Sequence, residues 1–100
     1  MKVIIANQRE NPRDLIRRAG YAEFRDPNTG ETSYVRRLRG DFYPRFHAYL
    51  EEEGQNVAVN LHLDQKQPSY RGSHAHSGEY AGPVIEQEAE RIKSILAPRA

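Results

Sequence analysis

The chain has 100 residues, of which 37% are hydrophobic and 29% charged, a composition typical of one small globular domain spanning 1–100. It contains no cysteine, which excludes a disulfide framework, a thiolate zinc site and a cysteine nucleophile. No apolar run approaches the ~20 residues of a membrane helix, and the apolar stretch that begins at Val3 is too short for a signal peptide. We therefore expect a cytoplasmic protein with no membrane partner.

Charge is distributed unevenly along the chain, although the net charge is only +1. Residues 1–50 hold ten Lys or Arg against six Asp or Glu, whereas residues 51–100 hold five against eight. Twelve of the fifteen cations are arginine, whose planar guanidinium suits bidentate contact with phosphate or carboxylate and stacking on flat rings. The basic half is where we expect an anionic partner to bind. A mixed-charge surface whose two halves attract each other explains the same counts without any partner.

The first elements in chain order are a short strand and a short helix. Residues 2–6 alternate weakly and predict the strand. Asn11 is a typical N-cap, Pro12 suits the first helical position, and Gly20 is placed just past the end of the helix. A helix this short needs tertiary packing to be stable.

The middle of the chain predicts two β-hairpins. Segments 21–25 and 32–38 are rich in aromatic and β-branched residues and flank a turn with Pro, Asn and Gly. Residues 42–51 and 56–64 alternate in polarity around a turn at Gly54. The predicted apolar face of this second hairpin consists of Phe46, Ala48, Leu50, Val57, Val59, Leu61 and Leu63. The predicted polar face consists of His47, Tyr49, Glu51, Asn60, His62 and Asp64.

The last third of the chain predicts a long loop and a second helix. Residues 65–82 are rich in Gly, Ser, Pro and Gln, and a loop of this length is often functional or disordered. Pro83 then opens an amphipathic helix that Pro98 ends. The predicted fold class is α+β, an antiparallel β-meander of about four strands with two helices packed on one face.

The histidines predict a metal site. His74, His76 and the nearby Glu79 offer imidazole and carboxylate ligands within the loop, and His47 or His62 could complete the set. Zinc or another transition metal accepts such ligands, and we predict no other cofactor. Solvated loop side chains are the alternative explanation of His74 and His76.

The same polar face also predicts acid–base chemistry. His62 and Asp64 lie two residues apart on one strand, with His47 expected across from them, and a carboxylate can orient an imidazole as a general base. No serine stands in a nucleophile elbow and no glycine-rich phosphate loop precedes a helix. Polar side chains that simply face solvent would explain the same residues, and we rank an enzyme below a binding protein.

Nucleic-acid binding is the specific hypothesis that we rank first. Arginines alternate with aromatic residues between positions 34 and 46, and such surfaces stack bases while neutralising phosphates. The predicted contact residues are Tyr34, Arg36, Arg37, Arg39, Tyr43 and Arg45. The expected ligand is single-stranded RNA or DNA, although no known nucleic-acid module signature is present.

A protein–protein interaction module is the remaining hypothesis. The acidic run 51–53 and exposed hairpin edges suit a protein partner, or a second copy by strand addition. A glutamate run in a turn also occurs simply to keep a strand edge solvated. The sequence thus leaves three kinds of function open, with a binding module ranked first.

Overall fold

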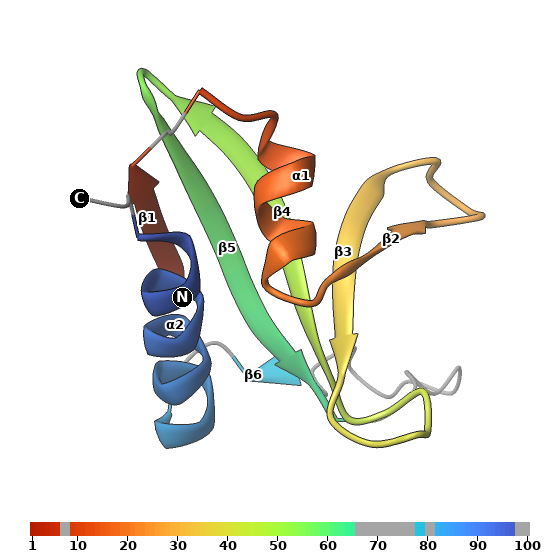
Figure 1. The fold of residues 1–100 in the computed structure, drawn as a ribbon. Helices are drawn as coiled ribbons and strands as arrows, with labels where there is room; N and C mark the ends of the chain where they lie inside the picture. Colours follow the sequence, from red (N-terminus) through yellow and green to blue (C-terminus); the bar gives the residue numbers. More distant parts are fainter. Residues whose placement is uncertain (7–8, 66–77, 80–81, 98–100) are drawn as a thin grey trace.

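The computed structural model describes residues 1–6, 9–65, 78–79 and 82–97, and this part of the chain forms six strands and two helices (Figure 1). The strands are β1 (Lys2–Ala6), β2 (Ala22–Arg25), β3 (Thr32–Arg37), β4 (Arg45–Glu53), β5 (Asn56–Asp64) and β6 (Gly78–Glu79). The helices are α1 (Pro12–Arg18) and α2 (Pro83–Leu96).

The strands form one antiparallel sheet of order β1-β5-β4-β3-β2, with β6 also paired to β5. Strands β2 to β5 are the predicted meander, and β1 adds to the outer edge of β5. Both helices lie on the same side of this sheet (Figure 1). The α+β prediction is therefore confirmed.

Strict alternation in β5 and its neighbours produces the core. Leu61 pairs with Ala48 and Leu63 with Phe46, so the apolar side chains of both strands face the helices as predicted. The buried sheet residues on this face are Val3, Ile5, Tyr34, Phe46, Ala48, Val57, Val59, Leu61 and Leu63. The helices contribute Leu15, Ile16, Ile85, Ala89, Ile92 and Leu96. The opposite face of the sheet is consequently left for polar residues.

The ends of α1 follow the predicted signals. The side chain of Asn11 accepts a hydrogen bond of 2.9 Å from the backbone N–H of Arg13, and Pro12 is the first helical residue. Gly20 adopts a positive φ of 91°, which a residue with a Cβ rarely adopts, and this turn leads the chain into β2. The helix begins and ends where its sequence predicts because both ends satisfy backbone groups locally.

Two boundaries of the second hairpin differ from the prediction. The strand predicted from 42 begins at Arg45, because Pro44 has no N–H to donate to the ladder. It also runs on to Glu53, which pairs with Asn56, so the turn consists of Gly54 and one further residue. Gly54 has a positive φ of 61°, as such a tight turn requires.

The predicted loop at 65–82 is described only in part. Gly78 and Glu79 form β6 and pair with Asp64 and Leu63. Residues 66–77 and 80–81 lie outside the described part of the chain. Neither described helix is both long enough and apolar enough to cross a bilayer.

A buried ionic network joins α2 to the start of β2. Glu88, only 4% exposed, accepts a 2.6 Å hydrogen bond from the hydroxyl of Tyr21. Arg91 donates to both carboxylate oxygens at 2.7 and 2.9 Å, and Arg36 approaches at 3.4 Å. Burial, together with the hydrogen bond to Glu88, raises the pKa of Tyr21 well above its usual range, so the hydroxyl remains a donor. The network links α2 to β3 and to the residue that precedes β2.

Candidate functional site

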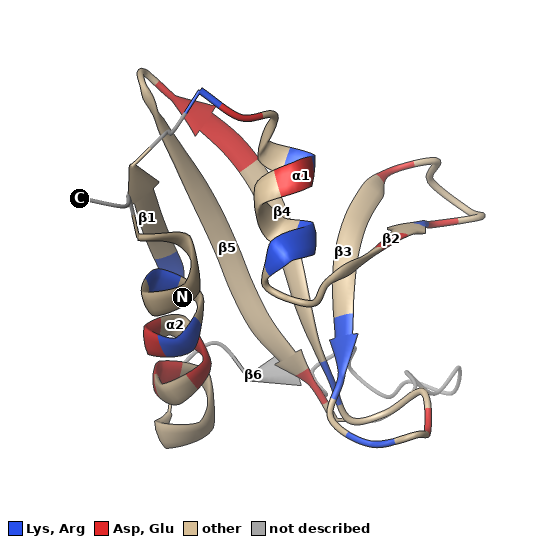
Figure 2. Cartoon of the chain, viewed as in Figure 1, with Lys and Arg blue, Asp and Glu red and all other residues tan. Residues whose placement is uncertain are grey.

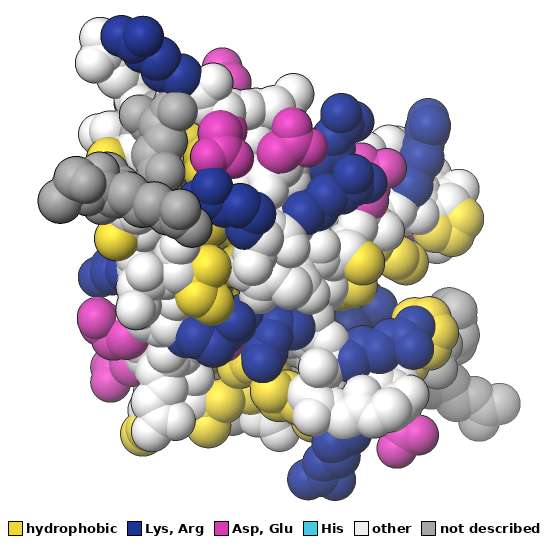
Figure 3. Space-filling model, in the orientation of Figure 1, with side chains coloured by type: hydrophobic (Ala, Val, Ile, Leu, Met, Phe, Trp, Pro, Cys, Tyr) yellow, Lys and Arg dark blue, Asp and Glu magenta, His cyan; other side chains and the backbone are white. Residues whose placement is uncertain are grey.

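The sheet face opposite the helices carries a cluster of polar side chains from three adjacent strands. His47 on β4 and His62 on β5 are directly paired, and their ring centroids lie 4.9 Å apart. This confirms the predicted cross-strand pair. Asp64 follows His62 on the same face, since strand side chains alternate. No described histidine is visible on the helix-bearing face (Figure 3), which agrees with this placement.

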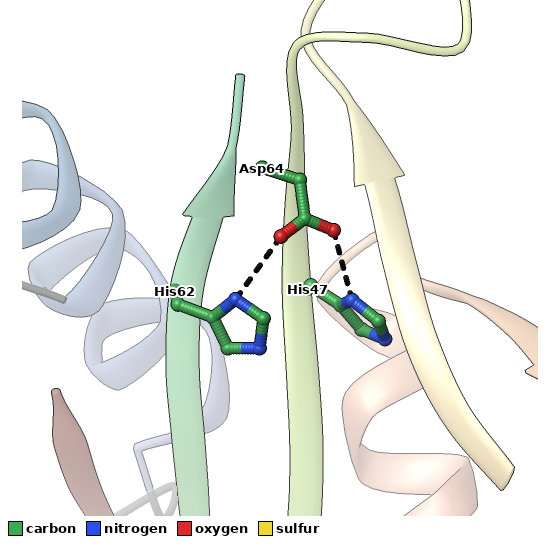
Figure 4. A group of neighbouring side chains, drawn as sticks. All are labelled: His47, His62 and Asp64. Atoms are coloured by element: carbon green, nitrogen blue, oxygen red, sulfur yellow. Dashed lines mark hydrogen bonds and ion pairs between the residues drawn. The ribbon is translucent and has the colours of Figure 1, made fainter. Parts of the chain in front are cut away.

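Asp64 lies at the centre of the cluster and binds both imidazoles (Figure 4). Its Oδ2 is 2.9 Å from Nδ1 of His47, and its Oδ1 is 3.1 Å from Nδ1 of His62. Arg45 donates from Nε to Oδ2 at 3.2 Å. Burial acts to raise the pKa of Asp64, but the hydrogen bonds and charges of His47 and His62 outweigh it and hold the pKa below the usual range. The carboxylate is therefore ionised at neutral pH.

The His47 ring is held from both ends and on its faces. Its Nε2 lies 2.6 Å from Oγ of Ser33 on β3, while its Nδ1 faces Asp64. Tyr49 stacks on the ring at 4.8 Å between centroids, and Phe24 meets it edge-on at 6.2 Å. Rotating this imidazole would break two hydrogen bonds and these ring contacts, so its orientation is fixed.

Arg45 is enclosed within the same cluster. It is 6% exposed, and its guanidinium lies 4.8 Å from the ring centroid of Tyr43 and 5.0 Å from that of Phe24. Its charge is paired with Asp64, which is its direct partner across β4 and β5. Arg45 therefore stabilises the carboxylate that also binds the histidines.

Three potential metal ligands come together in this cluster. One ligand atom each from His47, His62 and Asp64 lies within 4.8 Å of the other two. Ligands of a tetrahedral zinc ion lie ~2.0–2.2 Å from the metal and hence about 3.3 Å from one another. The distances from the Asp64 oxygens to Nδ1 of His47 and Nδ1 of His62, 2.9 and 3.1 Å, are close to that spacing. Two imidazoles and one carboxylate also suit iron, nickel or cobalt.

Comparison of the chain with protein-family models, curated protein sequences and solved structures gave no match. Its function is therefore argued from geometry.

Hydrogen bonds link Ser33 to His47 and His47 to Asp64 in the way that they link the three residues of a serine hydrolase triad. The two distances, 2.6 and 2.9 Å, are those expected of a serine hydroxyl, an imidazole and a carboxylate acting together. A nucleophile must reach its substrate, however, and Ser33, the second residue of β3, is only 2% exposed. We interpret the hydrogen bonds from Ser33 and Asp64 as contacts that orient the imidazole of His47. Sequence reasoning missed Ser33, because no local pattern links it to a histidine 14 residues later.

The six residues predicted to bind nucleic acid are not brought onto one surface. Tyr34 lies in the core, and Arg36 lies on the helix side, 6.0 Å from the centroid of Phe46. Arg45 is buried on the other face, and Tyr43 packs against it. Arg37 and Arg39 are exposed at the end of β3 and in the loop that follows, where Figure 2 shows a cluster of basic residues.

The predicted loop ligands are described less fully. His74 and His76 lie outside the described residues. The backbone of Glu79 pairs with Leu63, one residue before Asp64, whereas its side chain is not described. The metal prediction for these three residues stays a prediction.

Two hollows flank the polar cluster. One of about 440 Å³ lies beside the histidines and is lined by Met1, Lys2, Tyr49, Asn60, Leu61 and His62. The other, about 500 Å³, lies along β2, and its lining includes Phe24, Phe42, Arg36, Arg37 and Arg45 together with one acidic residue, Glu23. A ligand could reach the cluster from the first hollow, because His62 belongs to both.

Proposed function

We propose that this chain binds a divalent transition metal ion, zinc foremost, through His47, His62 and Asp64. The observation that carries the proposal is the convergence of two imidazole nitrogens and a carboxylate from adjacent strands within 4.8 Å. Zinc suits this set because it accepts nitrogen and oxygen ligands without a geometric preference of its own.

The surroundings of the three residues favour a metal in two ways. The carboxylate is ionised, as a metal ligand must be, and the orientation of His47 is fixed before any metal arrives. Arg45 donates to Oδ2 of Asp64, so we assign Oδ1 to the metal. Three protein ligands leave a coordination position for a further ligand, and the hollow beside His62 has room for one.

We expect the metal-free protein to bind one zinc ion in calorimetric titration. His62→Ala and Asp64→Asn should each weaken zinc binding by on the order of 100-fold, because each removes one of three ligands. Asp41→Asn is the matched control: it makes the same chemical change in an exposed loop and should leave the affinity unchanged. Thermal melts of each variant show whether it is folded at the titration temperature.

A paired variant separates the two metal predictions. If His74→Ala combined with His76→Ala abolishes binding while His62→Ala does not, the loop histidines are the ligands and the proposed site is wrong. Absence of zinc, nickel and cobalt binding by the folded wild type would also contradict the proposal.

Single-stranded nucleic-acid binding is a second candidate, and the hollow along β2 is the observation that favours it. Arg37 lies 4.3 Å over the ring of Phe42, whose side chain is 53% exposed. An exposed ring beside a guanidinium suits a base next to a phosphate. Arg36 and Arg45, which line the same hollow, already pair with carboxylates, so we assign the main phosphate contact to Arg37.

We expect Arg37→Ala combined with Arg39→Ala to reduce the salt dependence of binding to single-stranded RNA. Each lost phosphate contact on a single strand should lower the slope of log affinity against log salt by about 0.7. Phe42→Ala should instead weaken binding with little change in slope, and Lys93→Ala on α2 serves as the control cation. Fluorescence anisotropy measures all four proteins. No binding of wild type at ~50 mM salt, where non-specific contacts are strong, would rule out this candidate.

A further inference from the structure

A buried serine lies behind the imidazole of His47. Oγ of Ser33 is 2.6 Å from Nε2 of His47 and 3.5 Å from the carbonyl oxygen of Phe24, and Ser33 is 2% exposed. We infer that Ser33 is a positioning residue of the proposed metal site, whose hydroxyl lets His47 present an unprotonated Nδ1 to the metal. The inference rests on the proposed function.

In the metal-free protein the hydrogen bonds of His47 determine where its proton lies. An ionised carboxylate only accepts, so the nitrogen that faces Asp64 at 2.9 Å must carry a proton. At the other end of the ring Nε2 lies 2.6 Å from Oγ of Ser33, whose hydroxyl donates to the carbonyl oxygen of Phe24 at 3.5 Å.

A metal ion would change the protonation of His47 at Nδ1. Coordination by Nδ1 displaces the proton from that nitrogen, and the neutral ring then carries its proton on Nε2. Nε2 then donates to Oγ of Ser33, while the hydroxyl donates to the carbonyl oxygen of Phe24. The proton released from Nδ1 goes to solvent. A hydroxyl can hold both positions in this chain because it donates and accepts.

The metal-bound and metal-free states do not depend equally on Ser33. A metal polarises the imidazole that it binds, which makes the opposite N–H a stronger donor, and bonds from such donors are about twice as strong as neutral ones. Loss of the hydroxyl leaves that donor buried with no acceptor from Ser33. Second partners of metal-bound histidines are typically worth 10–100-fold in affinity. Ser33 thus favours the metal-bound state over the metal-free state.

The test compares Ser33→Ala with Ser33→Thr in the full chain, using zinc alone as the probe. We expect Ser33→Ala to weaken zinc binding by about 10–100-fold, whereas Ser33→Thr, which keeps the hydroxyl, stays within a few-fold of wild type. Two-bond ¹H–¹⁵N spectra of the imidazoles report the tautomer directly. In wild type, zinc should remove the proton from Nδ1 of His47 and leave a proton on Nε2.

The outcomes separate this inference from the proposed function. Wild type that binds no zinc contradicts the metal site itself. Wild type that binds zinc while Nε2 of His47 carries no proton, or a folded Ser33→Ala with wild-type affinity, contradicts the role of Ser33 alone. A purely structural role of Ser33 would lower the melting temperature of Ser33→Ala and leave the zinc affinity of the folded variant unchanged.

Discussion

Replacement of Glu88 by alanine should lower the free energy of unfolding by about 3 kcal/mol, because breaking a buried ion pair leaves its partners uncompensated. The Tyr21 hydroxyl is the partner most affected: Tyr21 is 3% exposed and donates to Glu88 at 2.6 Å. The side chains of Arg91 and Arg36 are 32% and 31% exposed, so water can replace part of what they lose. We therefore expect the lower end of the ~3–5 kcal/mol range for broken buried pairs.

Two further variants of α2 sharpen this prediction. Glu90→Ala removes an exposed glutamate from the same helix and should change stability by less than about 0.5 kcal/mol. Glu88→Gln keeps an acceptor for Tyr21 but loses the charge that Arg91 contacts, so its effect should lie between the other two. Urea unfolding followed by circular dichroism measures all three. Equal effects of Glu88→Ala and Glu90→Ala would show that the network contributes no net stability.

The sequence predicts the sheet well where its signals are local. Alternation over 56–64 and a glycine turn set the register of β4 against β5, and this register places His47, His62 and Asp64 on one face. The pairing of β1 with β5 could not be predicted, because no local pattern connects residues 2–6 with 56–60. Such long-range pairs depend on the whole core.

Other parts of the site lie beyond what the sequence can show. The contact of Ser33 with His47 depends on the register of β3 against β4, and the loop between these strands is too long to set it by turn geometry. The sequence predicts Arg45 to contact a phosphate. In the fold Arg45 lies opposite Asp64, and its guanidinium forms an ion pair with that carboxylate. The period of two also splits the arginine and aromatic run between the two faces, which is why Tyr34 lies in the core.

A second large effect is expected at Asp64 in the metal-free protein. Asp64→Ala should cost about 3–5 kcal/mol, because it leaves the buried Arg45 without its carboxylate. Nδ1 of His47 and Nδ1 of His62 lose the same hydrogen-bond partner, which adds to this cost. Asp41→Asn, in an exposed loop, should leave stability within about 0.5 kcal/mol of wild type.

The same carboxylate should make stability depend on pH in acid. Its pKa in the folded chain lies below its value in the unfolded chain, which is about 3.9 for an aspartate. The stabilisation by ionised Asp64 is therefore fully present above that unfolded value and is lost as pH falls through the folded pKa. Below about pH 4 we expect wild type to lose stability more steeply than Asp64→Asn, whereas Asp41→Asn should follow wild type. Urea unfolding between pH 7 and pH 3, with a chelator present, measures this difference. Parallel profiles of wild type and Asp64→Asn would mean that Asp64 titrates alike in the folded and unfolded chains, and its hydrogen bonds to His47 and His62 would then contribute nothing to the fold.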